Sequence, residues 1–166
     1  MLVMLALRSI LFALLLPGTV TVAVPYLIVH QTHAAQFEHW TLWRWLGLLP
    51  ISVGVAIVVW CIWDFAASGH GTLAPVDPPR QLVVRGPYRC VRNPMYVGVV
   101  VILLGEALLF QSFPLVVYTI FFFVAVQCFV VLYEEPALRR KFGESYEAYC
   151  RRVHRWWPQT PHGSAI

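Results

Sequence analysis

The segment Met95–Tyr133, MYVGVVVILLGEALLFQSFPLVVYTIFFFVAVQCFVVLY, is almost entirely apolar and contains one charged residue, Glu106. A bilayer span needs about 20 apolar residues, so this segment is long enough for two spans. Gln111-Ser112-Phe113-Pro114 is the natural break between them, because proline begins a helix well and continues one badly. We therefore predict a helical hairpin with spans at about 95–110 and 114–133.

The composition of the whole chain also indicates a membrane protein. Hydrophobic residues make up 59% of the 166 residues and charged residues 12%, against about 45–50% and about 25% in soluble domains. Two further uncharged runs, at about 10–29 and 45–63, bring the prediction to four transmembrane helices in one domain, residues 1–166. The first run is too long for the apolar region of a signal peptide, so we expect it to be retained.

Basic residues gather on one side of the predicted spans and set the orientation. The opposite side carries Arg44, whereas the loop after the second span and the segment after the fourth contain Arg80, Arg85, Arg89, Arg92, Arg139, Arg140, Lys141, Arg151, Arg152 and Arg155. We therefore predict a multi-pass protein with cytoplasmic N-terminus, second loop and C-terminus, in the inner membrane if the protein is bacterial. The net charge of +4 comes from these flanking residues, which argues against a nucleic-acid partner.

The segment after the fourth span predicts an amphipathic helix at the membrane surface. Spacings of four, four, three and four place one set of apolar residues on a single helix face: Leu138, Phe142, Tyr146, Tyr149 and Val153. The charged residues fall elsewhere, as in helices that lie in the interface. Gly143 within this helix costs roughly 1 kcal/mol relative to alanine, and a close approach by a ligand or another helix would explain it.

Cysteines and histidines indicate neither a disulfide framework nor a metal site. The four cysteines lack C-x-x-C spacing; they are Cys61, Cys90, Cys128 and Cys150. His30 and His33 are three residues apart but have no acidic or thiol residue beside them that could complete a metal site. Glu106 is a carboxylate within a span, where such groups face protein or a wet cavity. Two interpretations of Glu106 remain open: structural pairing with Gln111 or a lipid headgroup, and a role in lining a tunnel for a substrate.

Two segments rich in glycine, proline, tyrosine and charge flank the predicted hairpin, within residues 69–98 and 134–158, and therefore meet at its cytoplasmic ends. Glycines admit a ligand close to the backbone, tyrosines offer ring faces and hydroxyls, and the first amides of a helix after Asn93-Pro94 suit a carboxylate. Glu134 is placed to hold an ammonium group or a ribose hydroxyl. Taken singly, these residues also fit an ordinary turn, a helix start and interfacial aromatics; together they predict a nucleotide-like pocket.

Both segments resemble the isoprenylcysteine carboxyl methyltransferase family and its relatives, the phospholipid N-methyltransferases. The shared motifs are Gly86-Pro87-Tyr88, Arg92-Asn93-Pro94-Met95-Tyr96-Val97-Gly98, Glu134-Glu135 and Phe142-Gly143-Glu144-Ser145-Tyr146-Glu147-Ala148-Tyr149. The resemblance covers residues 69–158 and implies methyl transfer from S-adenosyl-L-methionine to a lipid-like acceptor. The cofactor contacts that it implies are Gly86, Tyr88, Asn93, Pro94, Tyr96, Gly98 and Glu134.

Two departures from the family pattern concern the acceptor. Asn93 stands where the prenylcysteine enzymes commonly have histidine. Val130 stands one helical turn before the paired acids, where those enzymes have an arginine that helps to receive the substrate carboxylate. Both differences weaken the case for a prenylcysteine substrate and leave the cofactor assignment unaffected.

The reaction predicts roles for individual side chains. Methyl transfer from a sulfonium is an in-line displacement, so the protein must align the nucleophile and strip it of water. We expect Arg89 or Arg92 to neutralise the cofactor carboxylate or an acidic acceptor, and Glu135 or Tyr96 to act as base if one is needed.

The identity of the acceptor stays open at this point. A prenylcysteine carboxylate, a phospholipid amine, a small thiol and a quinone-like lipid all fit. Two other classes also remain: a sterol-type membrane reductase using NADPH, and a non-catalytic membrane protein. The sequence does not indicate an oligomeric state.

Overall fold

The computed structural model describes residues 17–32, 42–68, 82 and 84–158. The start of the first predicted span at 10–16, His33 and most of the second loop lie outside these residues. Within the described part the regular elements are helices, and the β-type contact is an isolated parallel bridge between Val91 and His154. The predicted all-α class is confirmed for this part of the chain.

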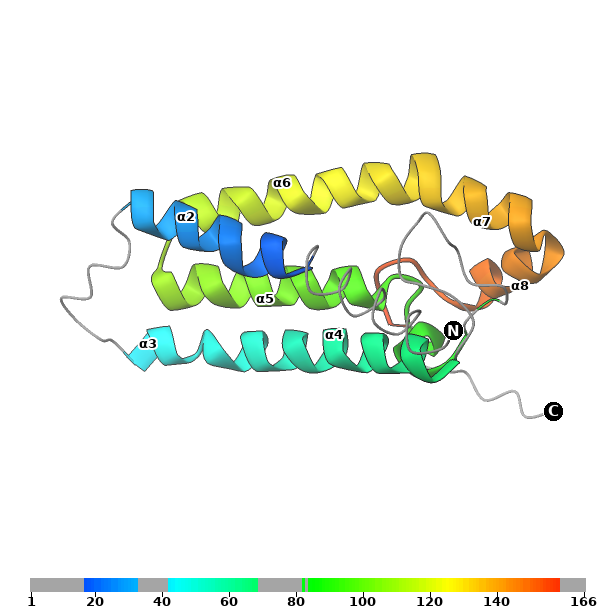
Figure 1. Ribbon diagram of the computed structural model, residues 1–166, viewed down its shortest axis with the longest axis horizontal. Coiled ribbons are helices and arrows are strands. Elements are labelled where there is room, and N and C mark those ends of the chain that lie inside the picture. The colour runs from blue at the N-terminus through cyan, green and yellow to red at the C-terminus, as the bar shows by residue number, and fades with distance from the viewer. Residues whose placement is uncertain (1–16, 33–41, 69–81, 83, 159–166) are drawn as a thin grey trace.

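The helices run side by side along the long axis of the molecule (Figure 1). α5 lies between α4 and α6, and α2 packs against both α5 and α6. Buried Val58, Val99, Ile102 and Leu103 form a core where α4 and α5 meet. The elements are a π turn (Thr19–Ala23), α2 (Val24–Gln31), α3 (Leu42–Trp45), α4 (Leu48–Ser68), a 3-10 turn (Gly86–Arg89), α5 (Pro94–Phe110), α6 (Phe113–Phe129), a second π turn (Val130–Glu134), α7 (Glu135–Phe142) and α8 (Glu144–Arg152).

The predicted hairpin is confirmed in position and in its break. α5 ends at Phe110, and Gln111 adopts the left-handed conformation with φ 48° and ψ 41°. α6 begins at Phe113 with Pro114 in its first turn, where the missing amide proton costs no hydrogen bond. The hairpin brings the start of α5 and the end of α6 to one end of the bundle, called the site end below.

One helix of the described residues is long and apolar enough to cross a membrane. It runs for 30 residues, from Phe113 to Phe142, through α6, the second π turn and α7. The other apolar helices are shorter: Thr19–Gln31, Leu48–Asp64 and Pro94–Phe110. One predicted span is thus supported by length and composition, and the four-span arrangement with its orientation remains a prediction.

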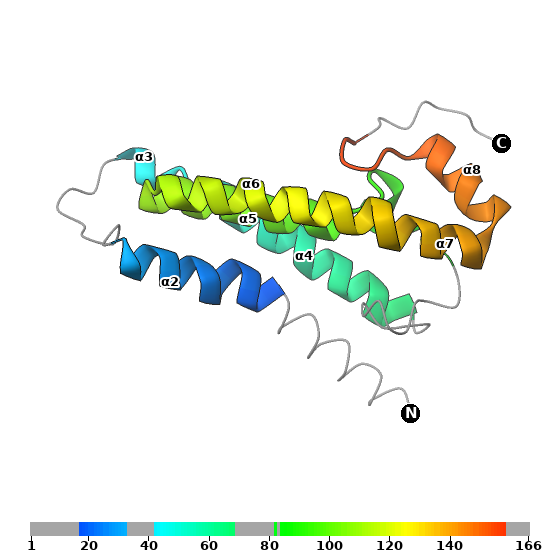
Figure 2. The same cartoon turned by 90° about the horizontal axis from the view of Figure 1, so that it is seen from above.

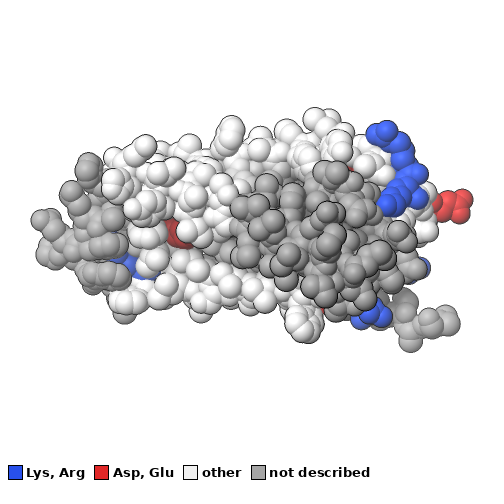
Figure 3. All heavy atoms as spheres, viewed as in Figure 1, with Lys and Arg blue, Asp and Glu red and all other residues white. Residues whose placement is uncertain are grey.

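The outer surface of the bundle is strongly apolar. Phe113 and Leu132 are each 75% exposed and Phe121 is 70% exposed, far more apolar area than water-facing helices of a monomer present. On the face drawn in Figure 3, the basic side chains gather mainly at the end where α7 and α8 lie. This pattern suits a bundle with lipid along its sides and water at the site end.

The C-terminal segment differs from the single amphipathic helix predicted for it. α7 continues the line of α6, and the chain turns back at Gly143 into α8 (Figure 2). Gly143 has φ +51°, and a Cβ built on it would meet nothing within 4 Å. Glycine is therefore required by the backbone conformation and not by a close neighbour. The predicted apolar face packs within this helical corner, where Tyr146, Tyr149 and Val153 form a cluster with Leu138 and Phe142.

Glycines hold α4 and α5 in close contact. A Cβ on Gly54 would lie 2.6 Å from the carbonyl oxygen of Gly98, and one on Gly47 would lie 2.6 Å from that of Gly105. The two contacts lie seven residues apart along the chain, the second at Gly47 directly before α4, and together they form a seam in which an added methyl group would meet backbone. Such small-residue seams are common where helices associate in membranes.

Filling this seam should weaken the fold. We expect Gly54→Ala to lower the free energy of unfolding by about 1–3 kcal/mol, because the added methyl group meets backbone that must shift. Gly18→Ala is the matched control, since a Cβ there has nothing within 4 Å. Thermal unfolding of both variants in detergent, followed by circular dichroism, tests the seam; equal melting temperatures would count against it.

Candidate functional site

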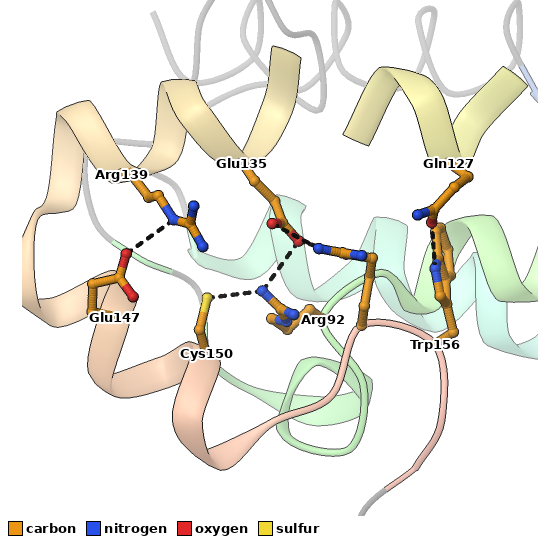
Figure 4. Close-up of polar contacts among 8 residues, drawn as sticks. Arg92, Gln127, Glu135, Arg139, Glu147, Cys150 and Trp156 are labelled. Atoms are coloured by element: carbon orange, nitrogen blue, oxygen red, sulfur yellow. Dashed lines mark hydrogen bonds and ion pairs between the residues drawn. The ribbon is translucent and has the colours of Figure 1, made fainter. Parts of the chain in front are cut away.

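Glu135 is the centre of a charged network at the site end (Figure 4). Its carboxylate accepts two hydrogen bonds from Arg155, at 2.7 Å from Nε and 2.9 Å from Nη2. Nη1 of Arg92 lies 3.1 Å from Oε1 of the same carboxylate. The side chain of Glu135 is 6% exposed, so the contacts form largely out of water, where charge-assisted hydrogen bonds are strong.

Arg92 connects this network to α8 and to the C-terminal segment. Its Nη1 also donates to Sγ of Cys150 at 2.8 Å, and its backbone amide donates to the carbonyl of His154 at 2.9 Å. The segment from Gly86 to Gly98 and the segment after α6 were predicted to face each other. Their contact is confirmed by the salt bridge between Arg92 and Glu135.

This network bears on the catalytic roles expected for Arg92 and Glu135. A carboxylate held by two guanidinium groups has little affinity for a proton, so the geometry argues against Glu135 as a base. Arg92 is directed to the Glu135 carboxylate, which it shares with Arg155, and this contact competes with its use for a cofactor carboxylate or an acidic acceptor. Arg89, the other arginine considered for that role, is exposed at the end of the 3-10 turn. In this structure Arg92 and Glu135 hold three segments together, and their catalytic roles remain predictions.

A second cluster lies beside the first and contains Tyr88, Tyr96 and Glu134. The Tyr96 hydroxyl donates a long hydrogen bond of 3.5 Å to Oε2 of Glu134. Tyr88 is in hydrogen-bonding contact with the thiol of Cys61 on α4. Burial raises the pKa of Tyr88 well above its ordinary value, and the neighbouring Cys61 and Glu134 raise it further. Tyr88 therefore keeps its proton at neutral pH and remains a hydrogen-bond donor.

Tyr149 fixes the 3-10 turn that carries Tyr88. Its hydroxyl donates to the carbonyl of Tyr88 at 2.7 Å, across the space between α8 and the turn. Gly86 begins this turn with φ +50°, and a Cβ there would collide with Asp64 and Trp60 at the end of α4. Gly86 is thus needed for both its conformation and its close contact.

Asn93 and Pro94 form the N-terminal end of α5 next to this cluster. Asn93 is 9% exposed, and Pro94 is fully buried as the first residue of the helix. The amides of Met95 and Tyr96 have no acceptor within the helix, because the first turn of any helix leaves its amides unpaired. Together with the helix dipole, they suit an anionic group.

Gly98 lies apart from the other predicted contacts, in the seam between α4 and α5. The sequence predicted that a ligand would come close to the backbone at Gly98. In this structure Gly54 and Val58 of α4 occupy that position. Helix packing is a sufficient reason for glycine there, and contact with a cofactor remains a prediction.

The sequence did not single out four residues that help to build the site: Cys61, Tyr149, Cys150 and Arg155. Tyr149 stands in a recognised motif and Arg155 in the basic C-terminal segment, but neither position indicates its partner. The C-terminal segment itself is anchored by Trp156, whose Nε1 donates to Oε1 of Gln127 at 2.7 Å and whose ring packs against Phe123. It therefore runs along the helix from the level of Glu135 to that of Gln127.

Comparison with known proteins decides the family. The profile of the phospholipid methyltransferase family matches residues 42–145. The chain belongs to this family. Two rice proteins, named probable protein-S-isoprenylcysteine O-methyltransferase in Oryza sativa subsp. indica and japonica, are each 28% identical to it over 142 residues, covering 80% of this chain and 71% of theirs. No solved structure matches the chain significantly. The predicted superfamily is confirmed, and with it a methyltransferase.

Removing the charge of Glu135 should destabilise the protein, because Arg92 and Arg155 would lose their shared partner. We expect Glu135→Gln to lower the free energy of unfolding by about 3 kcal/mol, as for other buried pairs deprived of one partner. Glu147→Gln is the control: its pair with Arg139 is about half exposed and should contribute about 0–1 kcal/mol. Thermal unfolding compares the two, and a similar loss in both would show that the Glu135 network has no special weight.

Proposed function

We propose that this protein is an S-adenosyl-L-methionine-dependent methyltransferase acting on an amphiphilic acceptor at the membrane surface. The observation that carries the proposal is the convergence of Tyr88, Tyr96 and Glu134 beside the N-terminal end of α5. Three different elements supply these side chains: the 3-10 turn, α5 and the second π turn. They meet at the end of the apolar bundle where the basic residues of α7 and α8 also lie.

The groups present at this cluster fit the parts of the cofactor. Glu134 suits its ammonium or ribose hydroxyls, the tyrosine rings suit adenine or the sulfonium, and the first amides of α5 suit its carboxylate. When bound, S-adenosyl-L-methionine supplies an electrophilic methyl group. The long hydrogen bond between Tyr96 and Glu134 is one that a ligand hydroxyl or ammonium group can replace.

The surroundings of Glu134 favour an acceptor that arrives through the lipid. Leu132 and Tyr133, directly before it, are 75% and 54% exposed on the outer surface of the helix. An acceptor with an apolar tail can therefore lie along the bundle while its polar end reaches the carboxylate. The protein's part is to hold that end in line and to exclude water, since an attacking group reacts faster when it is aligned and desolvated.

Among acceptors, the charges at the cluster favour an amine over a carboxylate. Arg92 and Arg155 are both directed to the single carboxylate of Glu135, which they share. Val130, at the position where the prenylcysteine enzymes have arginine, is 1% exposed and packed in the interior. Glu134 is the charged group that faces the tyrosines, and a carboxylate repels an anionic acceptor while attracting a cationic one. An amine must lose a proton before it attacks, and the carboxylate of Glu134, which accepts a hydrogen bond from the Tyr96 hydroxyl, is the nearest group to receive it.

Substitutions at the cluster should remove cofactor binding without unfolding the protein. We expect Glu134→Gln and Tyr96→Phe each to weaken binding of S-adenosylhomocysteine at least tenfold, with melting temperatures within a few degrees of the unsubstituted protein. Tyr133→Phe is the matched control, because Tyr133 is exposed beside Glu134 and stacks on Phe129. Calorimetric titration in detergent measures the affinities; unchanged binding in the first two variants would overturn the site.

The acceptor class can be identified from the labelled product. We expect the protein, supplied with methyl-labelled S-adenosyl-L-methionine and a membrane lipid extract, to yield a labelled lipid that keeps its label in mild alkali, as N-methyl groups do. A methyl ester would instead release labelled methanol, and that result would exclude the amine.

The competing reductase hypothesis has a direct test. Parallel titrations with S-adenosylhomocysteine and NADPH should show binding of the first and none of the second. Binding of NADPH and no binding of S-adenosylhomocysteine would replace the proposed function with a sterol-type reductase.

A further inference from the structure

Within the described residues, two helices contain a π turn, and a proline follows each turn at the same distance. The first turn, Thr19–Ala23, is followed by Pro25, and the second, Val130–Glu134, by Pro136. The hydrogen bonds also match: the amide of Val24 donates to Thr19, and the amide of Glu135 donates to Val130, five residues back in each case.

The prolines explain why the helices widen at these places. A proline inside a helix has no amide proton, and its ring collides with the carbonyl group four residues earlier. For Pro136 that carbonyl belongs to Leu132, and a local π turn moves it aside so that the helix can continue, as happens in membrane helices. Pro94 and Pro114 stand in the first turns of their helices, where no such carbonyl exists, and no π turn accompanies them.

The second π turn changes the direction of the two acids at the site. In a regular α-helix each residue advances by about 100°, so Glu134 would lie about 40° and Glu135 about 140° around the axis from Val130. Val130 is 1% exposed, so Glu135 would then point away from the interior. A π turn takes one residue more than an α turn. It therefore rotates Glu135 back towards the buried side and carries Glu134, already near that side, across it to the other flank.

The burial pattern agrees with this rotation. Val131, one α turn before Glu135, is 37% exposed, whereas Glu135 is 4% exposed. Glu134 meets Tyr96 on α5, and Glu135 meets Arg92 and Arg155. The two acids therefore lie on either side of the buried face of the helix, and each contacts a different partner.

We propose that Pro136 is a positioning residue: by imposing the π turn at Val130–Glu134, it aims Glu134 at the Tyr88–Tyr96 cluster and Glu135 at the two arginines. The consequence for ligand binding rests on the proposed function, whereas the consequence for the Glu135 network does not. Pro136 itself touches neither Arg92 nor Arg155 through a polar group, so its influence passes through the backbone.

The test compares two variants. Pro136→Ala restores an amide after the π turn at the site, and Pro25→Ala, the matched control, restores one after the π turn that is remote from the site. For the Glu135 network, Arg155→Gln should lower the melting temperature of the unsubstituted protein and of Pro25→Ala. In the Pro136→Ala background it should have no further effect, because Glu135 has already turned away. A drop of equal size in all three backgrounds overturns the proposal.

The ligand arm uses S-adenosylhomocysteine as the probe in detergent. We expect Pro136→Ala to weaken its binding at least tenfold and Pro25→Ala to leave it unchanged; unchanged affinity in Pro136→Ala contradicts the positioning of Glu134. If the unsubstituted protein does not bind the probe, the proposed function fails, and the melting experiment still decides the role of Pro136. Should Pro136→Ala fail to fold, Pro136→Ser restores the same amide and takes its place.

Discussion

The buried carboxylate of Glu135, held between Arg92 and Arg155, is the interaction on which the site end depends. It joins three segments distant in sequence: the turn before α5, the helix that leaves the hairpin, and the C-terminal segment. A carboxylate with 6% side-chain exposure is costly to desolvate, and its attraction to two arginines offsets that cost only while all three segments are in place. The network therefore couples the position of each segment to the other two. Tyr149 and Trp156 add neutral hydrogen bonds that hold the same segments in register.

The glycine seam fixes the position of α4 relative to α5. Because Gly54 and Gly98 bring the backbones of α4 and α5 into contact, the end of α4 lies against the 3-10 turn, and Cys61 reaches Tyr88. The candidate site is thus framed by the closely packed helices α4 and α5 and by the ion-paired loop and C-terminal segment. Glu134 and Tyr96 are hydrogen-bonded to each other beside these parts, with Tyr88 close by. The two adjacent acids thus differ in their surroundings: Glu135 is ion-paired with two arginines, and Glu134 contacts a tyrosine.

The sequence predicted the hairpin well, because an uninterrupted apolar run with a single proline-marked break has few alternative folds. It also predicted that the segments at the two ends of the hairpin would meet, and the pair of Arg92 and Glu135 shows that they do. It predicted less well what each residue would do there. Gly98, predicted to contact the cofactor, is packed against another helix, so that contact remains a prediction, and Gly143 marks a corner where a continuous helix was expected. Motifs and periodicity identify which positions are constrained. The sequence alone does not distinguish a glycine required for close packing from one required for a turn.

The sequence by itself determined the membrane-type composition, the helical hairpin, the end of the bundle that carries the polar residues and the methyltransferase family. These follow from properties that are local or additive along the chain, such as apolar run length, turn-forming residues and motif spacing. Only the tertiary structure decided which acid faces the tyrosines and which is neutralised by arginine, and it alone showed the parts played by Arg155, Cys61 and Tyr149. Those outcomes depend on how far the π turn rotates the two acids about the helix axis and on contacts between segments far apart in sequence. Neither can be predicted from a local sequence pattern.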